Sequence, residues 1–123
     1  MAGTLEKAEI LKLRTKQFAI RIVRLCRALP RSQEGKVLSN QLLRSGTSVA
    51  ANYRAVCRSR SRADFISKMA IVTEEIDETI FWLELLVETN VFPEHRLKSL
   101  LREGNELRAI FGASQRTAKA RAG

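Results

Sequence analysis

The sequence contains few of the residues that build metal centres, tight turns or disulfide frameworks. It has one histidine, two cysteines, two prolines and six glycines in 123 residues. A lone histidine without a second histidine or a paired cysteine leaves a transition-metal site short of ligands, so we expect no metal and no cofactor. The scarcity of turn-forming residues argues against a β-sandwich and favours long helices.

Long apolar runs are also missing. No stretch of about 18 apolar residues is present, so we expect no membrane-spanning helix. The first seven residues have no apolar segment, and we expect no secretory signal. Cys26 and Cys57 lie in helical patterns without CxxC spacing. We expect both to be buried as small apolar residues in a reducing cytoplasm.

Charge is present in excess and is unevenly distributed. Residues 1–62 carry 14 basic and 3 acidic residues, residues 63–92 carry one lysine and 7 acids, and residues 93–123 carry 7 basic and 3 acidic residues. The net charge is +9. This distribution favours side-by-side packing of oppositely charged helices, and the surplus positive charge would attract polyanions.

Apolar residues recur at steps of three, four and seven, which predicts an all-α protein. The predicted helices span about residues 5–29, 33–58, 63–89 and 93–111. Residues 112–123 contain no large apolar side chain, so we expect a frayed or disordered basic tail.

Three local signals divide the helices. Pro30 ends the first helix, Pro93 suits the first turn of the fourth, and Ser61 with Asp64 predicts a capping box at the start of the third. Gly46 lies inside the second helix, where it permits close approach of a neighbouring backbone or acts as a hinge.

Polar residues flank the apolar stripes of the two central helices. They form a predicted structural network of Arg44, Ser45, Ser48, Asn52, Glu75 and Glu78. If these helices pair antiparallel about a turn near residues 61–62, Ser48 meets Glu75 and Ser45 meets Glu78. Arg44 or Asn52 should then contact the carboxylates. A catalytic carboxylate pair is the alternative, but no second acid, metal or cleft signal supports it, so we expect no catalytic residue and no enzyme.

Arginines on the first two helices and the turn after them are the candidate contacts for nucleic acid: Arg21, Arg24, Arg27, Arg58, Arg60 and Arg62. The cluster at residues 58–62 could bind phosphate with help from the helix dipole. A solvated turn between helices is the alternative.

The third helix is apolar on more faces than one bundle core can cover. Its candidate subunit-interface residues are Phe81, Trp82, Leu85 and Ile71, with Ile20 and Val23 of the first helix as further members. Apolar residues on two helices fit a heterologous contact, in which two different patches meet, and a closed ring requires such a contact.

Several of these residues also form patterns typical of a known family. The patterns are Phe18-Ala-x-x-Ile22, Leu29-Pro30, Gln41-Leu-x-Arg44-Ser45-x-x-Ser48-Val49-x-x-Asn52-Tyr53, Ser61-x-x-Asp64-Phe65 and Glu75-x-x-Glu78-Thr-x-x-Trp82-Leu83. Over about residues 10–110 the chain resembles the bacterial four-helix-bundle family, also called the 23S rRNA-intervening-sequence proteins. One departure is Ala55, where the family often has glutamate.

The resemblance implies an antiparallel up-down four-helix bundle. It also implies a ring-shaped homo-oligomer, a pentamer, as in related accessory proteins of diversity-generating retroelements, which bind a reverse transcriptase and nucleic acid. The leading hypothesis is therefore a non-enzymatic oligomeric bundle that binds RNA or DNA through its basic surface. The alternative is an interaction scaffold or accessory subunit for another polypeptide, such as a polymerase.

Overall fold

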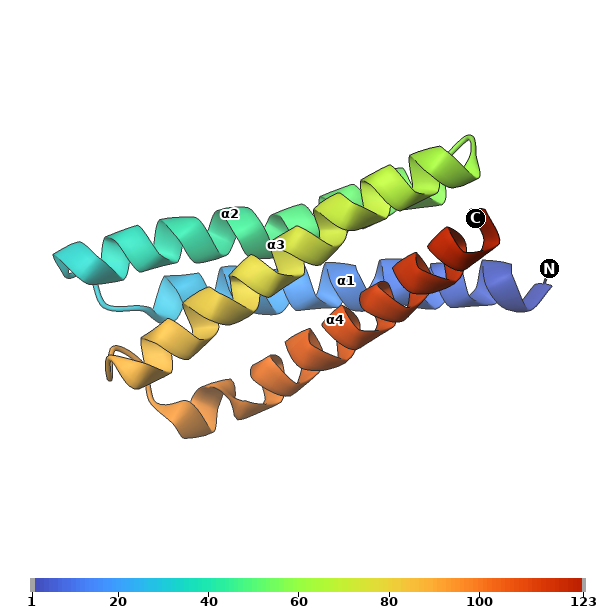
Figure 1. Cartoon of the computed structure of the whole chain (residues 1–123). Coiled ribbons are helices and arrows are strands. Elements are labelled where there is room, and N and C mark those ends of the chain that lie inside the picture. The colour runs from blue at the N-terminus through green and yellow to red at the C-terminus, as the bar shows by residue number, and fades with distance from the viewer. Residues whose placement is uncertain (1, 123) are drawn as a thin grey trace.

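The chain folds into four long helices joined by short turns. The computed structural model describes residues 2–122, with α1 Ala2–Ala28, α2 Gln33–Cys57, α3 Arg62–Glu88 and α4 Glu94–Ala122. Successive helices run in opposite directions along one bundle (Figure 1). This is the predicted all-α, antiparallel up-down four-helix bundle.

Local chemistry fixes the turns between the helices. The Ser32 hydroxyl accepts a hydrogen bond from the backbone N–H of Gly35 at 3.2 Å, and Ser61 accepts one from the N–H of Asp64 at 3.0 Å. The N-cap role of Ser61 in the predicted capping box is thereby confirmed. Asn90 follows α3 with a φ of 59°, the left-handed conformation that commonly ends a helix.

Apolar residues from all four helices form one continuous core. Its fully buried large members include Phe18, Ile22, Leu42, Val49, Met69, Ile76, Leu83, Leu107 and Phe111. A side chain at Gly46 would begin 2.8 Å from Ile22, so this glycine allows the close approach of α1 and α2. Of the two interpretations of Gly46, the structure favours close approach.

The structure corrects the prediction for residues 112–123. Helix α4 continues to Ala122, although Gly123, like Met1, lies outside the described residues. The tail is held at three points: Thr73 donates a hydrogen bond to the side-chain oxygen of Gln115 at 3.3 Å, Ala118 is buried, and Arg62 donates one to the carbonyl of Arg121 at 2.7 Å. Small and polar residues are therefore sufficient to keep this segment helical, because contacts with α3 add to its intrinsic helix propensity.

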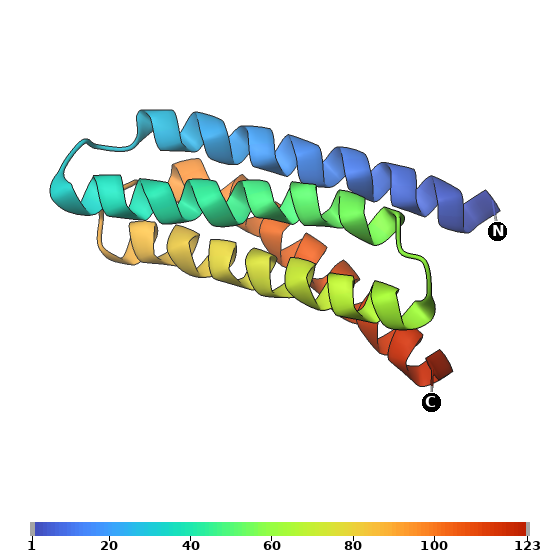
Figure 2. The same cartoon turned by 90° about the horizontal axis from the view of Figure 1, so that it is seen from above.

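The helices are not equally close. Helix α2 packs along α1 and α3, and α3 packs along α4, whereas α1 and α4 approach one another over a short stretch. Figure 2 shows α4 ending well away from the N-terminal part of α1. This divergence leaves space between α1 and α4.

Two further sequence expectations concern burial and membranes. Cys26 is half-buried, but Cys57 is exposed, so the prediction that both are buried is wrong for Cys57. Cys57 is the last residue of α2, where the chain leaves the core. Across residues 2–122, none of the helices combines the length and apolar content needed to cross a membrane.

Candidate nucleic-acid interface

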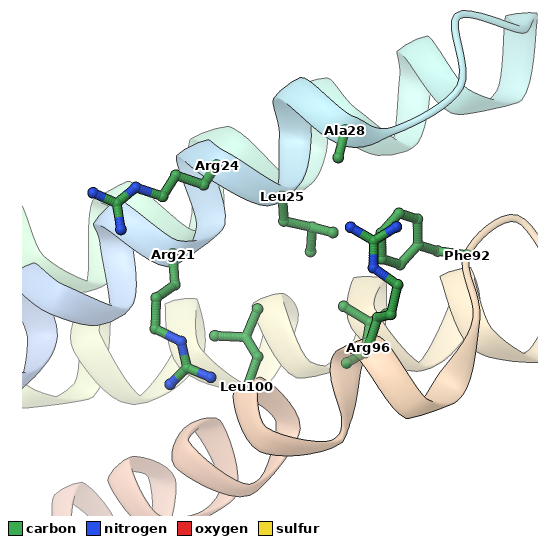
Figure 3. Close-up of a pocket in the computed structure, with 8 residues that line it drawn as sticks. Arg21, Arg24, Leu25, Ala28, Phe92, Arg96 and Leu100 are labelled. Carbon is green, nitrogen blue, oxygen red and sulfur yellow. The ribbon is translucent and has the colours of Figure 1, made fainter.

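Arginines from two helices line a pocket of about 260 Å³ at one end of the bundle. Helix α1 contributes Arg21 and Arg24, and Arg96 comes from the first turn of α4. Figure 3 shows Arg21 reaching from α1 towards Leu100, while Arg96 extends beside the ring of Phe92. The pocket lining contains no carboxylate, so its potential is positive.

Neighbouring groups hold two of these arginines in place. Arg21 donates a hydrogen bond to the hydroxyl of Ser99 at 2.9 Å. The guanidinium carbon of Arg96 lies 4.6 Å from the centre of the Phe92 ring, a cation–π contact. Neither contact neutralises the arginine charge, so both side chains remain able to bind an anion.

A larger cleft of about 800 Å³ opens at the opposite end of the bundle. Its apolar residues are Leu11, Tyr53, Val56 and Phe65, and its basic residues are Lys7, Arg60, Arg62 and Arg121. Its lining again contains no carboxylate. Tyr53 is buried at the border of the cleft, and this burial raises the pKa of its hydroxyl above the ordinary value.

The adjacent start of α3 already has a carboxylate. Asp64 accepts a hydrogen bond from the backbone N–H of Arg60 at 3.2 Å and pairs with Lys68 at 3.0 Å. The hydrogen bond from Lys68 and that backbone N–H lower the pKa of Asp64. A phosphate in the cleft would therefore meet the side chains of Arg60 and Arg62 rather than the helix N-terminus, which Asp64 occupies.

Both hollows lie on the same seam of the molecule. Each is lined by residues of α1 and α4, one at each end of the pair. Between them Arg14 of α1 donates two hydrogen bonds to Glu103 of α4, at 3.0 and 2.7 Å, and these raise the pKa of Arg14. We use the term α1–α4 seam for the pocket, the cleft and this ion pair.

The arginines predicted from the sequence divide between the two ends. Arg21 and Arg24 line the pocket, and Arg60 and Arg62 line the cleft. Arg27 and Arg58 are exposed outside both hollows.

Sequence reasoning missed three basic residues of the seam. Arg96 follows Phe92 by four residues, a spacing that brings a cation over an aromatic ring on a helical turn. Arg121 lies in the segment that the sequence predicts to be a frayed or disordered tail. Nothing in the sequence distinguishes Lys7 from its neighbours, because its position depends on where α4 ends.

The predicted polar network lies on the other side of the bundle, between α2 and α3. Arg44 pairs with Glu75 at 3.4 Å and contacts Glu78 closely, and Glu78 also accepts a hydrogen bond from the indole N–H of Trp82 at 2.9 Å. The Arg44 side chain remains 51% exposed. These contacts join the two helices at the surface and occupy both carboxylates.

The hydroxyl partners differ from those predicted. Ser45 lies 3.0 Å from the hydroxyl of Thr79, with both residues fully buried, rather than against Glu78. Ser48 accepts a hydrogen bond from Asn52 within α2 at 2.8 Å and does not meet Glu75. Short hydroxyl side chains reach only the nearest neighbour, whereas the glutamates extend outward to the longer Arg44.

The apolar outer face of α3 is partly exposed. Phe81 is 51% and Ile71 44% exposed, while Trp82 and Leu85 are half-buried against the core. Trp82 and Leu85, two of the four predicted interface residues, therefore also pack against the core of their own bundle. Beside Leu85 a hollow of about 380 Å³ is lined by Glu34, Val37, Leu38, Thr89 and Val91.

The described part of the chain contains no set of side chains that could bind a metal ion. Residues 2–122 contain no group of three histidine, cysteine, aspartate or glutamate side chains close enough to hold a metal ion. The functional groups of this fold are thus its basic hollows, its polar network and its exposed apolar positions.

Comparisons with known proteins agree with this architecture. Residues 7–113 match the family described as 23S rRNA-intervening sequence protein. A crystal structure of a protein of unknown function from the S23 ribosomal protein family of Bacteroides thetaiotaomicron is 37% identical, with a TM-score of 0.82 over 89% of this chain and 98% of the other. No curated protein matches the chain.

Proposed function

We propose that this protein, which belongs to the 23S rRNA-intervening sequence protein family, binds the backbone of RNA or DNA along its α1–α4 seam. In this proposal it acts without catalysis and as a homo-oligomer, a ring of five copies, in the cytoplasm. The free thiols of Cys26 and Cys57 suit a reducing compartment.

One observation carries the proposal: the two hollows of the seam are both lined by basic residues and by no carboxylate. Carboxylates are common in this protein, with 13 in the whole chain. Seven of them lie on α3, where Arg44 and Trp82 engage two, Glu75 and Glu78. In the α1–α4 seam Glu103 is paired with Arg14, so the two hollows present positive charge that phosphate groups would neutralise with release of their counterions.

The spacing of the hollows suits an extended polyanion. Arg21 and Lys7 are 14 residues apart on α1, which is roughly 21 Å at 1.5 Å per residue. A duplex of about six base pairs covers that length at 3.4 Å per pair. The half-buried side chain of Phe65 in the cleft would add a stacking surface for an unpaired base.

The proposal that the protein is not an enzyme depends on the partners of its acidic residues. Glu75 and Glu78, the pair that an enzyme would need, face Arg44 and Trp82. A general acid or base must reach the substrate proton that it transfers. Both carboxylates are instead engaged by Arg44, which leaves them poorly placed for that role.

Titration with labelled oligonucleotides tests the proposal. Single-stranded RNA, single-stranded DNA and duplex DNA would be titrated with the protein at 50 mM salt. We expect binding, with weaker binding by an Arg21→Ala/Arg96→Ala variant. The control is Arg54→Ala, which removes an exposed arginine of α2 that lines neither hollow. Absence of binding at this salt concentration would overturn the proposal.

A second candidate function is an interaction scaffold for another polypeptide, such as a polymerase. The apolar hollow beside Val37 and Leu85 favours it, because such a surface suits an apolar anchor of a protein partner. Co-purification of one stoichiometric protein after nuclease treatment, and its loss in a Val37→Glu variant, would support this alternative. Loss of every partner on nuclease treatment would count against it.

A further inference from the structure

Helix α1 carries a regular exposed stripe that the bundle does not use. Its members follow alternating steps of three and four residues: Ile10, Leu13, Gln17, Ile20, Arg24 and Arg27. All six are exposed, and Ile10 and Leu13 are each 57% exposed. Alternating steps of three and four place residues along one line of a helix, the spacing of a coiled-coil seam. We call these residues the α1 stripe.

Helix α3 carries a matching stripe on its outer face. Its members are Ile71, Glu74, Glu78, Phe81, Leu85 and Glu88, again at alternating steps of three and four. Four of the six are exposed, and Glu78 and Leu85 are half-exposed at the border with α2. We call these residues the α3 stripe.

The two helices carry opposite and equal charge. Helix α1 has seven basic and two acidic residues, a net charge of +5. Helix α3 has two basic and seven acidic residues, a net charge of −5. Each stripe therefore combines apolar side chains with charges that complement those of the other.

The two stripes face away from one another within one molecule. Helices α1 and α3 both contact α2 and α4, and they make no contact with each other in the described bundle. They lie on opposite corners, so their outer faces point in opposite directions. A copy therefore cannot pair its own stripes, and two copies cannot pair both at once through one self-complementary patch.

We propose that the α1 stripe of one copy packs along the α3 stripe of a second copy of this chain. The inference rests on the self-association included in the proposed function and names the surfaces that would carry it. Helices α1 and α3 run in the same direction, so a rotation about an axis along the bundle brings them together in parallel. Such a head-to-tail contact repeats from copy to copy, and it forms a ring when the rotation between copies closes.

A single parallel register matches three of the six pairs of stripe positions, and it leaves Leu13 opposite Glu74 and Arg24 opposite Leu85. An offset of 61 residues sets Ile10 against Ile71 and Ile20 against Phe81. The same offset sets Arg27 against Glu88, an oppositely charged pair at the end of the stripe. This assigns Arg27 to the interface rather than to nucleic acid. Arg24 belongs to the α1 stripe and also borders the pocket, while Arg21 and Arg96 stay on the open seam.

Cysteine cross-linking tests the pairing directly. In a background with Cys26→Ser and Cys57→Ser, one preparation carries Ile20→Cys and another carries Phe81→Cys. Mixed and oxidised after subunit exchange, they should give a disulfide-linked dimer of twice 13.9 kDa. Each variant alone should give none, because equal positions do not meet. Cross-linking of Phe81→Cys with itself, or none in an oligomeric mixture, would overturn the proposed pairing.

Charge reversal provides a second test, which distinguishes failure of this particular interface from failure of self-association as a whole. Sedimentation equilibrium of the wild type should give a mass several times 13.9 kDa. Arg27→Glu should raise the dissociation constant at least tenfold, and added Glu88→Arg should restore it. A monomeric wild type would refute self-association as a whole. An oligomeric wild type with no rescue in the double variant would refute this interface alone.

Discussion

The two sides of the bundle differ in how their helices meet. Between α2 and α3, the buried hydroxyls of Ser45 and Thr79 pair at 3.0 Å, and Arg44 joins the two helices at the surface. Between α1 and α4 the chain leaves a pocket of about 260 Å³ and a cleft of about 800 Å³, with one ion pair between them. One side thus supplies closely packed core, and the other supplies accessible basic surface.

The difference follows from the residues that face each seam. The α2–α3 side uses small residues and short hydroxyls, which permit close approach. The α1–α4 side uses long arginines and Phe92, which hold the helices apart and keep charge in water. In this protein the loosely packed side is where we locate binding.

Truncation of one leucine on each side of the bundle should give the largest difference in the free energy of unfolding. Leu83 is fully buried in α3, so Leu83→Ala should lower the free energy of unfolding by about 2–5 kcal/mol. Leu100 lines the pocket and already borders open space, so Leu100→Ala should fall at or below the lower end of that range. Urea unfolding of both variants measures the two values, and an equal loss would contradict the difference in packing.

The buried hydroxyl pair gives the next largest effect. Thr79→Val should destabilise the fold by about 0.5–1.5 kcal/mol, because Ser45 loses its partner across the α2–α3 side and keeps only its hydrogen bond to the carbonyl of Leu42. Ser45→Ala/Thr79→Val should cost less than the sum of the single changes, since both polar groups are then removed. Thermal unfolding of the three variants completes the cycle. Strict additivity would mean that the two hydroxyls do not interact.

The two ion pairs that join neighbouring helices should differ modestly in their contribution to stability. Arg14 pairs with Glu103 through two hydrogen bonds and is 29% exposed, whereas Arg44 is 51% exposed. Arg14→Met should therefore cost about 1 kcal/mol, and Arg44→Met about 0–1 kcal/mol. Unfolding at low and high salt measures both. A larger loss for Arg44→Met would reverse the expected order.

The smallest effect is a change in the titration of one phenol. Tyr53 is the sole tyrosine, and burial raises its pKa above the ordinary value of about 10. The neutral form is favoured in the fold, so Tyr53 contributes stability below pH 10 that is lost as the pH rises further. Ultraviolet absorbance should show less ionised phenol at about pH 10.5 in the folded protein than in urea. Equal ionisation would contradict burial beside the cleft.

Much of the fold could be predicted because it depends on local patterns. The repeat of apolar residues predicted the four helices, and Pro30, Ser61 and Pro93 marked the turns between them. The helical tail could not be predicted this way. Its anchors, Thr73 and Arg62, lie about 40 to 60 residues away in the chain.

The site could be predicted in part for the same reason. Arg21 and Arg24 were predicted as cations on the first helix, and Arg60 and Arg62 as cations in the turn after the second. That they lie on one seam with Arg96 and Arg121 depends on how α4 diverges from α1, which no local pattern encodes. The partner of Ser45 was likewise misassigned, because side-chain reach decides between Thr79 and Glu78.

The most direct test of the account is the salt dependence of nucleic-acid affinity. The logarithm of the binding constant falls with the logarithm of salt at about −0.7 to −0.9 per phosphate neutralised. Arg21→Ala/Arg96→Ala should therefore make the slope shallower by about 1.4 to 1.8, while Arg54→Ala leaves it unchanged. An unchanged slope in the double variant, or an equal change in the control, would contradict binding along the α1–α4 seam.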